Sequence, residues 1–125
     1  MSAFILIVEN DAGDRIALLD LLAEEGYEVE TVENGMDALE SIKYRTPALI
    51  ILDMMMPLMD GYTFLNHLQT RGLWPGLPVI VMTASPVSYR HASERIGRQY
   101  CILKPFELED MLARVRTLVG GEGNE

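Results

Sequence analysis

The chain has 125 residues, 49% of them hydrophobic, which is enough for one domain with a full hydrophobic core. This composition excludes intrinsic disorder, no apolar run is long enough for a transmembrane helix, and no basic region precedes the first apolar stretch as in a signal peptide. The net charge of −9 disfavours direct nucleic-acid binding, and the lone Cys101, which cannot form an internal disulfide, fits a reducing cytoplasm.

Strand-type and helix-type segments alternate five times along the chain. The predicted strands are Phe4–Val8, Tyr27–Val32, Ala48–Leu52, Val79–Met82 and Tyr100–Leu103. The predicted helices cover about residues 13–25, the stretch between Gly35 and Thr46, and about residues 62–71, 85–97 and 107–119. In the first helix the expected apolar stripe is Ile16, Leu19, Leu22 and Ala23. The alternation predicts a single α/β unit with a doubly wound parallel sheet covered by helices on both faces.

The most informative stretch runs from Pro47 to Gly61. Its apolar residues have the pattern of a fully buried parallel strand, and they end at one carboxylate, Asp53. Ligands of open α/β sheets bind just outside the carboxyl ends of the strands, so Asp53 stands where chemistry is expected. An aspartate there is also a common helix cap or turn former, so this residue alone does not decide between the two interpretations.

Polar residues follow three other predicted strands in the same way. The candidates are Glu9, Asn10 and Asp11 after the first strand, Thr83 after the fourth and Lys104 after the fifth. In a doubly wound sheet these strand ends open on one edge, where the side chains can converge. They suggest phosphoryl transfer to the Asp53 carboxylate, with neighbouring acids holding Mg²⁺ and with Thr83 and Lys104 contacting phosphate oxygens.

These motifs together resemble the receiver domain of bacterial two-component response regulators. The matching segments are ILIVEND at 5–11, ILDMMMPLMDG at 51–61, VIVMTA at 79–84 and LKPF at 103–106. The resemblance implies a flavodoxin-like fold with five helices and strand order 2-1-3-4-5. We therefore expect a receiver domain over residues 1–120 and a polar tail over 121–125.

The resemblance also implies a role for each site residue. Asp53 is the expected phosphoacceptor, Thr83 the switch hydroxyl and Lys104 the lysine of the family, with a cis peptide bond before Pro105. The expected Mg²⁺ ligands are Glu9, Asn10, Asp53 and the Met55 backbone carbonyl. Such a protein hydrolyses its own aspartyl phosphate slowly and is not a turnover enzyme.

The implied partners are a sensor histidine kinase or histidine phosphotransfer protein and a downstream protein, with a phosphorylation-dependent homodimer as a further option. We expect a cytoplasmic location and no partner among nucleic acids or membranes. Because no output region follows Val119, the output is expected to pass through another protein unless the chain is part of a longer one.

Two positions depart from the family pattern. Asn10 stands where the family usually has a second acid, and Asp11 could replace that acid only if the loop shifted by one residue. Cys101 stands where the family usually has an aromatic switch residue, and the adjacent Tyr100 would face the other side of the strand. These departures leave open an alternative, a pseudo-receiver that serves as an interaction module with weak or no phosphorylation. A flavodoxin-like cofactor binder is disfavoured, since no glycine-rich loop follows the first strand.

Overall fold

The computed structural model describes residues 4–120 and contains one parallel sheet. Its strands are β1 (Phe4–Val8), β2 (Glu28–Val32), β3 (Leu49–Asp53), β4 (Val79–Thr83) and β5 (Cys101–Leu103). They pair in the order β2-β1-β3-β4-β5, which confirms the predicted fold. A helix connects each strand to the next, as parallel strands require.

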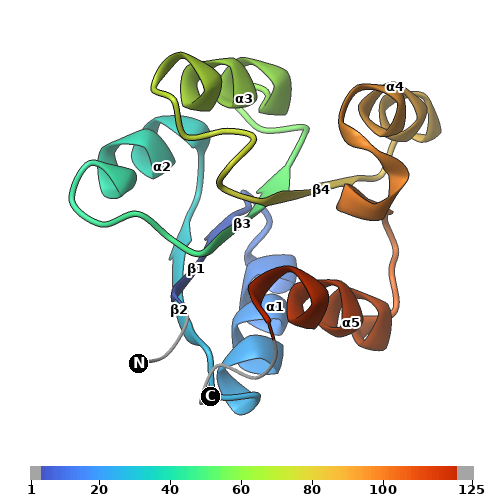
Figure 1. Cartoon of the computed structure of the whole chain (residues 1–125). Coiled ribbons are helices and arrows are strands. Elements are labelled where there is room, and N and C mark those ends of the chain that lie inside the picture. Colours follow the sequence, from blue (N-terminus) through green and yellow to red (C-terminus); the bar gives the residue numbers. More distant parts are fainter. Residues whose placement is uncertain (1–3, 121–125) are drawn as a thin grey trace.

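The helices lie on both faces of the sheet. They are α1 (Ala12–Glu24), α2 (Gly35–Ile42), α3 (Gly61–Thr70), α4 (Pro86–Ile96) and α5 (Leu108–Val119), with a short 3₁₀ helix η1 (Arg98–Tyr100) before β5. In Figure 1, α2, α3 and α4 lie on one side of the sheet, whereas α1 and α5 lie together on the other. None of the helices formed by residues 4–120 is long and apolar enough to cross a lipid bilayer.

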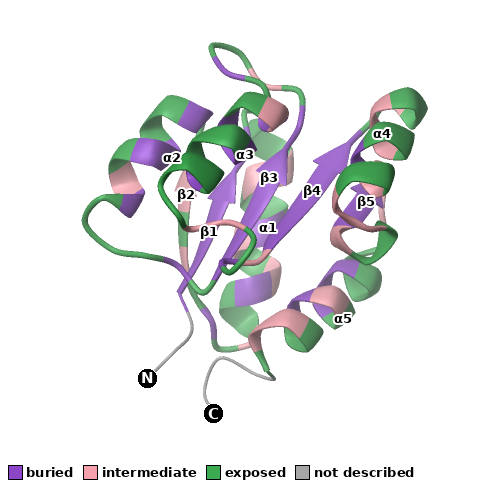
Figure 2. Ribbon diagram, turned by 45° about the horizontal axis from the view of Figure 1, so that its top comes forward, coloured by how far each residue is buried: buried purple, intermediate pink, exposed green. Residues whose placement is uncertain are grey.

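Two apolar clusters hold these layers together. Figure 2 shows the central strands buried along their length, because both of their faces are covered. Alternate strand residues point to opposite faces, so Leu6 and Ile50 pack toward α2 and α3 while Ile5 and Ile51 pack toward α1 and α5. Phe64 of α3 is fully buried in the first cluster.

Four of the helices begin with a side-chain N-cap at the edge of the sheet where the strands end. The Asp11 carboxylate accepts from the Asp14 amide at 2.8 Å, and Asp60 accepts from Thr63 at the same distance. Asn34 and Ser85 cap α2 and α4 in the same way. After the Asp60 cap only glycine fits, because a Cβ at position 61 would lie 2.9 Å from the Met54 Cα.

The structure corrects the sequence interpretation in two places. Tyr100 was expected to begin the last strand, but it ends the η1 helix, and Cys101 is the first residue of β5. The expected stripe of α1 was right at Leu22, which is fully buried, and wrong at Ile16, which is 56% exposed. Leu18, outside the expected stripe, is fully buried. The α1 sequence carries apolar residues around most of the helix, so periodicity alone did not select the buried face.

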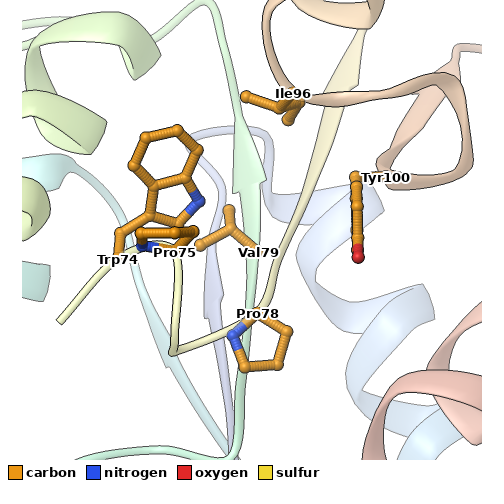
Figure 3. A pocket seen from close by; sticks show the side chains of 6 residues that line it. All are labelled: Trp74, Pro75, Pro78, Val79, Ile96 and Tyr100. Carbon is orange, nitrogen blue, oxygen red and sulfur yellow. The ribbon is translucent and has the colours of Figure 1, made fainter.

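A small cavity lies near the amino end of β4, away from the carboxyl ends of the strands. It has a volume of about 90 Å³ and is lined by Trp74, Pro75, Pro78, Val79, Ile96 and Tyr100. Figure 3 shows the Trp74 indole and the Tyr100 ring on opposite sides of the opening. Trp74 packs partly buried against the first apolar cluster.

Candidate functional site

The sheet register brings two predicted acids side by side. Val8, the last residue of β1, pairs with Leu52 of β3, so Glu9 follows β1 at the level where Asp53 ends β3. Both carboxylates are largely shielded from solvent, since the side chains of Glu9 and Asp53 are 1% and 10% exposed. Two acids this close and this buried need a cation or a proton between them.

Lys104 supplies that cation from the loop after β5. Its ammonium lies 2.7 Å from Glu9 Oε1 and 3.3 Å from Asp53 Oδ2. A third carboxylate, Asp14 Oδ2, lies 2.9 Å from the same nitrogen. The peptide bond between Lys104 and Pro105 is cis, as expected.

The pKa values follow from this arrangement. Burial raises the pKa of Glu9, and the hydrogen bond from Lys104 opposes that effect only in part. Burial alone would lower the pKa of Lys104, but hydrogen bonds to Glu9 and Asp14 outweigh it and leave that pKa above its usual value. Lys104 is therefore charged at neutral pH and offers a fixed positive charge beside Asp53.

Backbone and hydroxyl groups orient the remaining parts of the site. The Met55 amide donates to Asp53 Oδ1 at 3.0 Å and fixes the rotation of that carboxylate. Thr83 is 1% exposed and ends the neighbouring strand β4, and its Oγ1 accepts from the Ser85 amide at 3.1 Å. The Thr83 hydroxyl proton remains available for another acceptor.

Asn10 lies at the rim of the site. It is exposed, and its side chain forms no hydrogen bond within residues 4–120. Its backbone carbonyl accepts from Arg15 at 3.2 Å, and the Glu9 carbonyl accepts from the same guanidinium at 2.9 Å. Asp11 does not take over the role of a second acid, because its carboxylate caps α1 and its amide donates to Glu9 Oε2.

The sequence interpretation missed Asp14. It lies one helical turn before Leu18 and two before Leu22, so it heads the buried stripe of α1. A carboxylate on that stripe needs a polar partner, and Lys104 is the partner it contacts. The signal was present in the sequence, but it depended on choosing the correct face of α1.

Comparison with known proteins identifies the family of this chain. The sequence model of the response regulator receiver domain matches residues 5–116. The chain belongs to the response regulator receiver family.

Relatives and solved structures agree with this assignment. The chain is 40% identical over 120 residues to the response regulator MprA of Mycobacterium ulcerans (strain Agy99), covering 95% of the chain and 51% of that protein, and equally similar to MprA of Mycobacterium tuberculosis (strain H37Rv). It therefore spans about half the length of these relatives.

The receiver domain of a signal transduction histidine kinase from Syntrophus aciditrophicus is 30% identical, with a TM-score of 0.83 over 95% of this chain and 91% of that one. The chemotaxis response regulator CheY4 of Vibrio cholerae is 25% identical, with a TM-score of 0.83 over 94% and 99% of the two chains.

Receiver domains generally use Mg²⁺ at the phosphorylation site, and the residues of this receiver domain fit that ion. The Glu9 and Asp53 carboxylates, which both contact the Lys104 ammonium, could supply oxygen ligands. Mg²⁺ usually takes one or two carboxylates and completes its octahedral shell with water and phosphate oxygens. With Asp14, three carboxylates surround one ammonium, so the local charge is negative and favours a divalent cation.

Proposed function

We propose that this receiver domain accepts a phosphoryl group on Asp53 from a phosphohistidine of a sensor histidine kinase or of a histidine phosphotransfer protein. The observation that carries the proposal is the contact of the Lys104 ammonium with both Asp53 and Glu9. This contact joins the proposed nucleophile, a cation and a second acid at the carboxyl edge of the sheet. The phosphorylated form would then act on a downstream protein.

In the proposed reaction a carboxylate oxygen of Asp53 attacks the phosphorus of the donor. The P–O bond of an acyl phosphate forms as the P–N bond of phosphohistidine breaks, and the electron pair of that bond stays on the imidazole nitrogen. Glu9, Asn10, Asp53 and the Met55 carbonyl would hold Mg²⁺, which would supply positive charge to the phosphoryl oxygens. Lys104 donates to another phosphoryl oxygen, and the Met55 amide holds Asp53 in a fixed orientation.

Thr83 provides the proposed conformational response. Its hydroxyl would donate to a phosphoryl oxygen on Asp53, and a movement of the side chain toward that oxygen would weaken the 3.1 Å hydrogen bond that Oγ1 accepts from Ser85. Ser85 caps α4 through its own side chain, so the change would reach the start of that helix. This route differs from the exchange of an aromatic side chain, because position 101 holds a fully buried cysteine whose thiol donates to the Gly97 carbonyl.

The pseudo-receiver alternative rests on Asn10 and Cys101. Neither substitution removes the contacts among Glu9, Lys104 and Asp53, so we favour a working phosphoacceptor with a weakened metal site. We also propose a cytoplasmic location, slow hydrolysis of its own acyl phosphate, a domain that ends near residue 120 and a homodimer that depends on phosphorylation.

A small phosphodonor tests the proposal without a kinase. Wild-type protein incubated with acetyl phosphate and Mg²⁺ should gain the mass of one phosphoryl group in intact mass spectrometry. Asp53→Asn should keep the circular dichroism spectrum and lose this adduct, whereas Asp20→Asn, at an exposed position of α1, should be phosphorylated like the wild type. An Asp53→Asn protein that is phosphorylated to the same extent would contradict the assignment.

A further inference from the structure

Asp14 is joined to the site by a contact that the proposed mechanism does not use. It comes from the first turn of α1, where the buried side chains further along the helix are leucines. Its carboxylate lies 2.9 Å from the Lys104 ammonium, closer than the 3.3 Å that separates this ammonium from Asp53. The lysine is therefore held more closely by α1 than by the proposed phosphoacceptor.

The hydrogen-bonding capacity of Lys104 is fully used in this state. An ammonium has three N–H donors, and its three carboxylate partners are Glu9, Asp14 and Asp53. A phosphoryl oxygen that takes a hydrogen bond from Lys104 must therefore displace one of these partners.

Asp53 Oδ2, the most distant partner at 3.3 Å, belongs to the residue that would carry the phosphoryl group, so Glu9 and Asp14 are the partners that hold Lys104 away from that group. Solvent exposure indicates which of these two is released more easily. The Asp14 side chain is 44% exposed, so water can replace the lysine as its partner. Glu9 is 1% exposed, so water cannot replace the lysine as its partner, and losing Lys104 would leave its buried charge dependent on a bound metal ion alone. Asp14 also borders a hollow of about 330 Å³ next to Ala17, Ala84 and Phe106, which gives its carboxylate room to move away from Lys104.

We propose that Asp14 is a positioning residue that competes with the phosphoryl group for Lys104 and is the partner released on phosphorylation. The inference rests on the proposed function, since it assigns a regulatory contact to the same site. Asp14 holds the lysine away from the incoming group and keeps a negative charge nearby. Both effects disfavour the phosphorylated state, so Asp14 lowers the affinity of the site for a phosphoryl group or its mimic.

Beryllofluoride, a stable mimic of the phosphoryl group, tests the proposal by direct binding. Calorimetric titration in Mg²⁺ would compare the wild type with Asp14→Asn, Asp14→Glu and Asp20→Asn, after circular dichroism has shown that all four are folded. Asp14→Asn should bind the mimic roughly fivefold to tenfold more tightly, which corresponds to about 1 to 1.4 kcal/mol. Asp14→Glu should restore weak binding because it restores the charge, and Asp20→Asn should match the wild type.

The lysine itself gives a second readout. The chain contains two lysines, Lys43 and Lys104, so a protein labelled with ¹³C-lysine shows two side-chain spin systems in NMR. Asp14→Asn should shift the Lys104 signals before any mimic is added and leave Lys43, which pairs with Glu40 on the surface, unchanged.

The outcomes separate this inference from the proposed function. If the wild type binds beryllofluoride and Asp14→Asn binds it equally or more weakly, Asp14 does not compete for Lys104, and only this inference is overturned. An Asp14→Glu protein that binds as tightly as Asp14→Asn would overturn it as well. If the wild type binds no beryllofluoride in Mg²⁺, the proposed function fails, and the inference that rests on it fails too.

Discussion

Replacing Lys104 with methionine would remove the ammonium that three carboxylates share, while keeping a side chain of similar length. In the wild type this ammonium opposes the rise that burial causes in the pKa of Glu9. Without it the pKa of Glu9 rises further, because burial is no longer opposed and Asp53 remains close. In the unfolded chain the pKa of Glu9 is near 4.5, and in the folded variant it is higher. The variant should therefore lose stability as the pH rises from the unfolded-state pKa to the folded-state pKa.

The size of the effect follows from the burial of the lysine. Exposed ion pairs contribute up to about 1 kcal/mol, and breaking a buried pair costs about 3 to 5 kcal/mol. The Lys104 side chain is 16% exposed, which lies between these two cases. We therefore expect Lys104→Met to lower the free energy of unfolding by about 2 kcal/mol at pH 7.5. At pH 5 the loss should be smaller, about 1 kcal/mol as for an exposed pair, because a protonated Glu9 needs no cation.

Urea unfolding in the absence of Mg²⁺, followed by circular dichroism at pH 5 and pH 7.5, measures both numbers. Lys43→Met is the matched control, since the Lys43 ammonium is 3.1 Å from Glu40 and both side chains are more than half exposed. It should change the free energy of unfolding little at either pH. A Lys104→Met protein as stable as the wild type at pH 7.5, or a loss that does not depend on pH, would refute the reasoning.

The remaining predictions concern the metal and the route of the signal. Asn10→Asp should tighten Mg²⁺ binding roughly tenfold by adding a charged oxygen ligand. It should also lower the stability of the metal-free protein through repulsion among carboxylates. Equal Mg²⁺ affinities in a titration would show that Asn10 does not weaken the site. Beryllofluoride should change amide hydrogen exchange more over Ala84–Arg90 than over Cys101–Leu103, because Thr83 is bonded to the loop before α4 and Cys101 is too small for an aromatic-type switch. Equal changes in the two segments would contradict this route.

The strands and the strand-end residues could be predicted because their signals are local. Short apolar runs with β-branched residues indicate buried strands, and parallel strands place their carboxyl ends on one edge. That reasoning put Asp53, Glu9 and Lys104 at one edge of the sheet, and the structure shows the contacts among them. The register and distances come from packing of the whole sheet, which no single segment encodes.

One error came from a residue whose neighbour lies far away in the sequence. Asp14 was not assigned to the site because the residue it contacts, Lys104, lies 90 residues further along the chain. The error at Tyr100 has a local cause instead: it lies in a 3₁₀ turn, because Gly97 ends α4 with a positive φ of 103° and a short turn precedes β5.

The most direct test of the account is to locate the phosphoryl group on the chain. Wild-type protein treated with acetyl phosphate and Mg²⁺ would be reduced with borohydride, which converts an acyl phosphate of aspartate to homoserine, then digested and sequenced by mass spectrometry. Homoserine should appear at position 53 and should be absent when acetyl phosphate is omitted. Homoserine at another aspartate, such as Asp14 or Asp60, with unmodified Asp53 would contradict the central claim.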